Sequence, residues 1–217
     1  NQPFVSIAFA ADPVILSYSP LGNWKLDEGN GTSVSDSSSN GNTGSIVGGA
    51  SWASGKKGAA TMLDGVSGYV TISDSATLDS MSALSLGVWV KLTQLPSQNY
   101  VLVGKEGSAG QSYRITVGSS GKVGFAVKTA NNGWYTSGTN TLSQFALTTN
   151  TWNHIVGVYD GSFIRLYING SLVATGSGTI SGNIYNSASP LHFGNKSSLN
   201  VDYTNGIIDE VILYGNA

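Results

Sequence analysis

The sequence contains no cysteine, and its 217 residues include only two histidines, two methionines and five prolines. The absence of cysteine excludes disulfide bonds and thiolate metal ligands, but it does not exclude export from the cell. Charged residues make up only 10% of the chain and the net charge is -2. Because no basic stripe is available to hold phosphates, we expect no nucleic-acid partner.

Long apolar runs are also missing, so the sequence predicts no membrane span. Residues 1–21 carry no charge before Asp12, and Ala8-Phe9-Ala10 is typical of the small-x-small end of a secretory signal, with cleavage before Ala11. Two interpretations stay open: the first ten residues are a remnant of export, or residues 1–21 form an apolar arm. We expect an extracellular or cell-surface protein.

Serine, threonine and asparagine supply most of the polar side chains, and the chain also contains 29 glycines. The apolar fraction is 40%. That apolar fraction is typical of a folded globule, and these polar residues are the usual turn formers. A chain of this length with many short strands is commonly one domain. We therefore predict a single domain over residues 22–217, preceded by the segment 1–21.

Alternation of apolar and polar residues predicts strands, and no window shows sustained helical periodicity. In "ALSLGVWVKL", residues 83–92, every second residue is aliphatic while Trp89 faces the other way. "RLYINGSLVA" places Asn169-Gly170 between two strand-like runs, which predicts a two-residue hairpin turn. A second hairpin is predicted in "YRITVGSSGKVGFAVKT", residues 113–129, with further strands at 69–73, 100–104, 153–159, 190–194 and 207–214.

Short antiparallel strands at this spacing predict an all-β sandwich or barrel. Residues 29–50 are too polar and glycine-rich to form a strand throughout, so we expect a long surface loop there. Loops of this length without structure of their own are usually functional or fixed by a metal.

Several segments in order resemble a known family: "GNWKLDEGNGTSVSDSSSNGNTGSIVGGASWASGKKGAATMLDGVSGYVTI", "LSLGVWVKL", "WNHIVGVYDGSFIRLYINGSLVA", "LHFGN" and "NGIIDEVILYG". They are similar to the laminin-G-like, concanavalin A-like domains of exported microbial proteins. The resemblance implies a jelly roll of two antiparallel sheets. Such folds host lectins, adhesion domains, structural subunits and some glycosidases, so fold alone does not give function.

Catalysis is not expected. Glycoside hydrolysis needs two carboxyl groups that flank one bond, and the resembled glucanases carry a Glu-x-Asp-x-x-Glu strand that is missing here. Asp209 and Glu210 are adjacent in a predicted strand, so their side chains should point to opposite faces. His154 and His192 lie among apolar residues and are interpreted as structural imidazoles. No G-x-S-x-G nucleophile motif is present.

Calcium is a possible structural cofactor. The 29–50 loop supplies Asp36, Asn40 and Asn42, and calcium prefers such oxygen ligands. In the resembled domains a calcium ion commonly ties the N-terminal loop to the last strand. That likeness implies that Asp209 meets Asp36 and Asn40, with Glu28 or Asp27 as an addition. Asx turns and solvation would account for the same loop residues without an ion.

Sugar binding needs an apolar platform for the pyranose ring together with planar polar groups for its hydroxyls. The segment "TANNGWYTSGTN", residues 129–140, offers both in one loop, and Tyr203 is a second candidate. The predicted ligand-binding residues are Asn131, Asn132, Trp134, Tyr135 and Tyr203. The alternative is that these aromatic rings fold back to cover a sheet face.

Two functions follow from these patterns. The first is a non-catalytic carbohydrate-binding or adhesion module, stabilised by calcium, whose partner is a glycan or polysaccharide. The second is a structural subunit of an extracellular filament or surface layer, in which residues 1–19 complete the sheet edge of a neighbouring copy.

Overall fold

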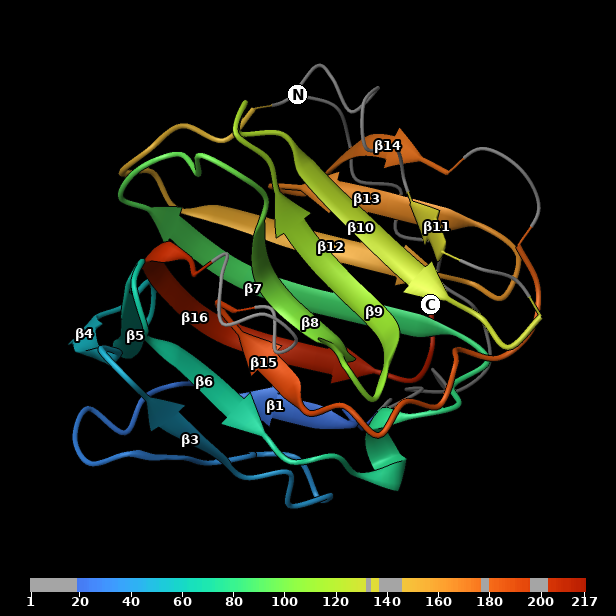
Figure 1. Cartoon of the computed structure of the whole chain (residues 1–217), viewed down its shortest axis with the longest axis horizontal. Helices are drawn as coiled ribbons and strands as arrows, with labels where there is room; N and C mark the ends of the chain where they lie inside the picture. Colours follow the sequence, from blue (N-terminus) through green and yellow to red (C-terminus); the bar gives the residue numbers. More distant parts are fainter. Residues whose placement is uncertain (1–18, 132–133, 137–145, 177–179, 196–202) are drawn as a thin grey trace, which may run out of the picture.

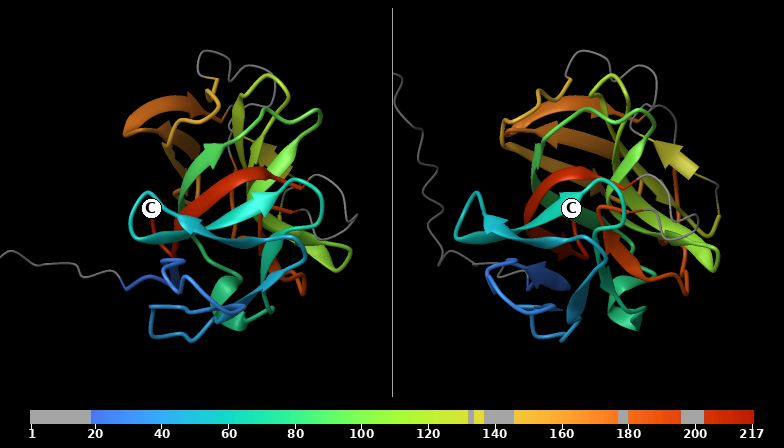
Figure 2. Two further views of the ribbon diagram at one scale, coloured as in Figure 1. Left: turned by 90° about the vertical axis from the view of Figure 1, so that its left-hand side faces the viewer. Right: turned by 60° about the vertical axis from the view of Figure 1, so that its left-hand side comes forward.

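The computed structural model describes residues 19–131, 134–136, 146–176, 180–195 and 203–217. They form two antiparallel β-sheets packed face to face, together with a 3-10 turn, η1 (Ala76–Leu78) (Figures 1 and 2). This arrangement confirms the predicted all-β sandwich. In the part of the chain that the structure describes, no helix has the length and apolar character needed to cross a membrane.

The first sheet, sheet A, follows the order β14-β13-β12-β7-β16-β5-β4, and β1 also pairs with β16. Its strands are β1 (Gly22–Trp24), β4 (Ser51–Ser54), β5 (Ala59–Asp64), β7 (Leu84–Leu92), β12 (Asn153–Tyr159), β13 (Ile164–Ile168), β14 (Ser171–Thr175) and β16 (Asn205–Tyr214).

The second sheet, sheet B, follows the order β11-β10-β9-β8-β15-β6-β3-β2. Its strands are β2 (Ser33–Val34), β3 (Gly44–Val47), β6 (Tyr69–Ile72), β8 (Tyr100–Gly107), β9 (Gly110–Val117), β10 (Val123–Lys128), β11 (Trp134–Thr136) and β15 (Leu191–Phe193). In Figure 1 sheet B lies in front of sheet A, and β15 runs through its middle.

The core lies between the two sheets and is aliphatic and aromatic. The alternating residues of β7 supply its centre: Leu84, Leu86, Val88 and Val90 are fully buried. From the other strands, Trp24 and Phe193 meet edge to face with ring centroids 5.3 Å apart. Because the period of a strand is two, the remaining residues of β7 must point to the outer face of sheet A, as predicted for Trp89.

Both predicted hairpins are confirmed. β13 and β14 are joined at Asn169 and Gly170, whose φ angles of 51° and 81° are the positive values that such a two-residue turn requires. β9 and β10 pair around the segment Gly118–Gly121, where Gly121 donates a backbone hydrogen bond to Gly118.

The prediction of a continuous surface loop over residues 29–50 is wrong in part. Two short strands, β2 and β3, lie within it and pair with each other. β3 also pairs with β6, where Gly44 lies opposite Ile72 and a Cβ atom at residue 44 would meet the Thr71 carbonyl oxygen at 2.9 Å. Pairing with β6 therefore gives these glycine-rich residues an extended backbone that their own composition does not favour.

Candidate functional site

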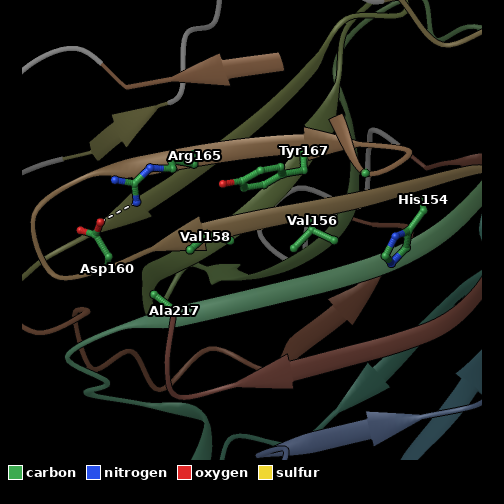
Figure 3. Close-up of a pocket in the computed structure, with 8 residues that line it drawn as sticks. His154, Val156, Val158, Asp160, Arg165, Tyr167 and Ala217 are labelled. Atoms are coloured by element: carbon green, nitrogen blue, oxygen red, sulfur yellow. Dashed lines mark hydrogen bonds and ion pairs between the residues drawn. The ribbon is translucent and has the colours of Figure 1, made fainter. Parts of the chain in front are cut away.

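An open hollow of about 570 Å³ lies on the outer face of sheet A, over β12 and β13 (Figure 3). The inward residues of β12, Ile155 and Tyr159, are fully buried in the core, so the alternate residues face outward. We call this feature the β12–β13 hollow. It is lined by His154, Val156, Val158, Asp160, Arg165, Tyr167, Gly170 and Ala217.

The floor of the hollow is apolar and carries one aromatic ring. Val156 lies opposite Tyr167 in the strand pairing, and Val158 lies opposite Arg165. Paired residues on neighbouring strands place their side chains on the same face, so the two valines and the tyrosine ring lie together on this face (Figure 3). The Tyr167 hydroxyl points along the strand toward the Arg165 end of the hollow (Figure 3).

One end of the hollow is charged. Arg165 Nη1 donates to Asp160 Oδ2 at 2.5 Å, and the guanidinium group lies over the Phe163 ring at 5.8 Å from its centroid. Asp160 Oδ1 accepts from the backbone N–H groups of Ser162 and Phe163. Burial alone would raise the pKa of Asp160, but these hydrogen bonds outweigh it and the pKa lies below the ordinary value.

The other end is aromatic. The His154 ring stacks on Trp89 of β7 with centroids 4.9 Å apart, and Lys56 Nζ lies 4.7 Å from the centre of the indole. Partial burial lowers the pKa of His154, so the imidazole is neutral near pH 7. Asn169 of the adjoining turn accepts the backbone N–H of His154, which fixes the turn against this end of the hollow.

These groups suit binding better than hydrolysis. An apolar and aromatic floor between planar polar groups is the arrangement that holds a sugar ring by its CH face and its hydroxyls. Asp160 is the one side-chain carboxylate in the lining, and its oxygens are already engaged. The hollow therefore lacks the pair of free carboxyl groups that glycoside hydrolysis requires.

The predicted loop site is only partly described. Asn131 is exposed at the end of β10, and Asn132 lies outside the described residues. The backbone of Trp134 and Tyr135 forms β11, the edge strand beside β10, while their side chains lie outside what the structure describes. The assignment of these residues to ligand binding stays a prediction.

Tyr203 lies on a different surface, the outer face of sheet B. Its ring is 6.2 Å from Tyr69, which in turn lies 4.9 Å from His192. His192 is only 6% exposed, and its Nδ1 atom has no hydrogen-bond partner among the described residues. Burial lowers its pKa from 6.5 to about 4, so the ring is neutral over most of the physiological range.

The predicted calcium ligands do not come together. Asp36 accepts four hydrogen bonds within its own segment and β1: Oδ1 from the backbone of Asn23 and Ser38, and Oδ2 from the Ser38 hydroxyl and the Asn42 backbone. Burial opposes ionisation, but these donors hold the pKa of Asp36 below its usual value. Asn40 Nδ2 donates to the Leu21 carbonyl oxygen at 3.1 Å.

Asp209 meets another part of the chain. Its Oδ2 accepts the backbone N–H groups of Lys56 and Lys57 at 2.7 and 3.0 Å, and its Oδ1 accepts that of Glu210. Glu28 Oε1 accepts from the Ser35 backbone. Among the described residues no group of three or more acidic or histidine side chains is arranged to hold a metal. Calcium binding by these residues stays a prediction.

Sequence patterns alone do not reveal the hollow, because it depends on how the strands pair. Phe163, Arg165 and Tyr167 alternate in the sequence, which places them on one face of a strand but does not distinguish a structural from a binding role. Nothing in the sequence showed that β12 would lie beside this face in a register that sets Val156 next to Tyr167.

Comparison with known proteins identifies the family to which the fold belongs. A laminin G-type family profile, described as the concanavalin A-like lectin/glucanases superfamily, matches residues 63–217. A search of curated proteins found no match.

Three solved structures illustrate the likeness. Domain 4 of an extracellular GH43 arabinanase from Geobacillus stearothermophilus, in complex with arabinotriose, has a TM-score of 0.70 at 22% identity and covers 91% of this chain and 92% of that one. The binding domain of Paraclostridial Mosquitocidal Protein 1 has a TM-score of 0.70 at 15% identity, and the match covers 92% of this chain and 49% of that one. The binding domain of botulinum neurotoxin DC, in complex with SialylT, has a TM-score of 0.66 at 14% identity, and the match covers 91% of this chain and 48% of that one. The chain thus spans about half of each toxin domain, and at these identities the likeness establishes the fold alone.

Proposed function

Because this chain belongs to the concanavalin A-like lectin/glucanases superfamily, we propose that it is a non-catalytic carbohydrate-binding module that acts outside the cell, with the β12–β13 hollow as its binding site. The observation that carries the proposal is the apolar and aromatic floor of Val156, Val158 and Tyr167, bounded by charged groups at one end. Pyranose and furanose rings present the complementary combination of CH faces and hydroxyls.

The known binding partners of similar domains support a glycan as the ligand. The arabinanase domain was solved with arabinotriose and one toxin binding domain with SialylT. The arabinanase domain is covered almost completely by this chain, so its complex is the more direct support. The ligand of this chain is proposed on chemistry, as an oligosaccharide long enough to reach from Tyr167 toward the Trp89–His154 stack.

The test is a glycan array and a panel of insoluble polysaccharides, followed by titration calorimetry on any ligand found. We expect Tyr167→Ala to weaken binding by roughly tenfold, since a ring contact with a sugar contributes on the order of 1 kcal/mol. Tyr185→Ala is the matched control, because Tyr185 is an exposed tyrosine that does not line the hollow, and it should leave the affinity unchanged.

Trp134→Ala separates the two candidate sites. If it abolishes binding while Tyr167→Ala does not, the site belongs to the β11 segment and the hollow is not the binding surface. If neither the array nor the polysaccharides give binding by the folded wild-type chain, the carbohydrate-binding proposal is wrong.

A further inference from the structure

A lysine ammonium group is enclosed by four oxygen atoms inside the sandwich. Lys105 is fully buried, and its Nζ donates to Asp74 Oδ1 at 2.6 Å, to the Ser189 carbonyl oxygen at 2.9 Å and to the Ser187 carbonyl oxygen. Asp79 Oδ1 lies 3.2 Å away as an ion-pair partner. We call these four oxygens and the ammonium the Lys105 cage.

The cage joins three segments that are distant in the sequence. Lys105 lies on β8 opposite Leu191 of β15, so its side chain points to the interior face of sheet B. The two aspartates flank η1, and the two serines precede β15. Ser189 is held in place by hydrogen bonds from its hydroxyl to Gly110 and from its backbone to the Ser187 hydroxyl. The Ser189 carbonyl oxygen is thus positioned by contacts that do not involve the lysine.

The charges in the cage do not balance. Two carboxylates face one ammonium, and the three N–H bonds of Lys105 are used by Asp74, Ser187 and Ser189. The side chain of Asp79 is 4% exposed, and its contacts among the described residues are the ion pair with Lys105 and a weak backbone donor, Ser187, at 3.4 Å. Burial raises the pKa of Asp79, Lys105 opposes this, and the nearby Asp74 charge adds to it.

Carboxylate and carbonyl oxygens around a single buried cation form the ligand set that calcium prefers, and a divalent ion would neutralise both acids. We propose that Lys105 is an internal cation that fills a divalent-cation site, and that its removal leaves the chain with a calcium site made of Asp74, Asp79 and the carbonyl groups of Ser187 and Ser189. This site is separate from the residues Asp36, Asn40 and Asp209 and does not depend on the proposed sugar-binding function.

The test compares wild type, Lys105→Ala and Lys105→Ala/Asp79→Asn at pH 7. Calcium is titrated by calorimetry, and terbium is titrated as a luminescent probe, with Tyr113 as its sensitiser because the charges of Asp79 and Asp74 act on its hydroxyl. We expect Lys105→Ala to bind one calcium equivalent more than wild type, with a Kd on the order of 0.1–1 mM, as for weakly charged extracellular sites. The double variant should lose this extra equivalent.

Thermal melting supplies the second readout. Lys105→Ala should melt below wild type without calcium and recover with calcium but not with equal magnesium, because magnesium demands tighter octahedral geometry. Asp79→Asn with Lys105 retained should melt no lower than wild type, since one acid then balances one ammonium. Lys91→Ala, at a half-buried lysine outside the cage, is the matched control and should show no gain in calcium response.

Two results would overturn the proposal. One is a Lys105→Ala variant that is folded and binds no more calcium than wild type, or that fails to fold in calcium. The other is an Asp79→Asn variant that is destabilised as strongly as Lys105→Ala, because Asp79 would then be a required partner of the lysine and not an excess charge.

Discussion

His192 makes the stability of the protein depend on pH. Its ring is buried beside Tyr69, no described residue hydrogen-bonds to Nδ1, and burial lowers the pKa from 6.5 to about 4. A group whose folded pKa is depressed contributes stability that is present above its unfolded pKa and is lost as pH falls through the folded value. We therefore expect the free energy of unfolding to fall by about 3 kcal/mol between pH 6.5 and pH 4 through this residue alone.

The measurement is urea unfolding at several pH values for wild type and His192→Phe, which keeps a ring against Tyr69 and cannot be protonated. The difference between the two curves isolates the histidine, because contributions from Asp79, Asp209 and the other acids cancel. His154→Phe is the matched control; His154 is half-buried, so it should remove a smaller part of the pH dependence. Parallel curves for wild type and His192→Phe would show that His192 does not couple to folding.

The neighbouring acids of β16 differ sharply in their contribution to stability. Asp209 accepts three backbone N–H groups, including both of the Lys56-Lys57 turn, whereas Glu210 makes a single ion pair with the exposed Lys57 at 3.4 Å. We expect Asp209→Ala to reduce the free energy of unfolding by roughly 2–3 kcal/mol, since buried donors lose their acceptor. Glu210→Ala should cost under about 1 kcal/mol, as exposed ion pairs do.

Urea unfolding of the two variants at pH 7 makes this comparison, and each serves as the control for the other. Equal losses in both would mean that the carboxylate hydrogen bonds of Asp209 do not hold the turn. Burial raises the pKa of Asp209 while its backbone donors lower it.

At the scale of elements, β16 shows where alternation along a strand fails as a guide. Simple alternation predicts that Asp209 and Glu210 point to opposite faces. The pairing with β7 shifts between Asp209 and Ile212, and Glu210 adopts a φ of 46°. This bulge lets both acids contact the Lys56-Lys57 turn. Asp209 accepts the backbone N–H groups of the turn, and Glu210 pairs with the Lys57 side chain. A bulge inserts one residue without a composition signal, so the sequence does not reveal it.

Other elements could be predicted because their signals are local. The aliphatic stripe of β7 and the Asn169-Gly170 turn depend on period and on backbone φ angles, which single residues encode. β2 and β3 could not be predicted, because their extended backbone depends on pairing with partner strands and is not favoured by their own glycine-rich composition. Prediction of the hollow needs both local patterns and strand register. The outward faces of β12 and β13 can be predicted from the sequence, but the register between the two strands cannot.

For the whole molecule, the described N-terminal contacts of the sandwich lie at its β1 edge. Leu21 donates its backbone N–H to Leu213, and β1 continues this pairing with β16 from Gly22 to Trp24. Pro20 and Leu21 are also tied to the following segment by Asn40, which donates to both of their carbonyl groups. The described contacts that anchor the N-terminal side of the domain therefore begin at Pro20.

Deletion of residues 1–18 tests whether the chain acts as a single module or as a subunit assembled through its N-terminal segment. Because the pairing of β1 with β16 is retained, we expect the shortened chain to melt within about 2 °C of the full chain, a change of less than roughly 1 kcal/mol. Light scattering across a dilution series should give the same oligomeric state for both chains, with masses that differ only by the deleted residues. A full chain that forms large particles which the shortened chain cannot form would instead favour the structural-subunit function, and residues 1–18 would then carry the assembly.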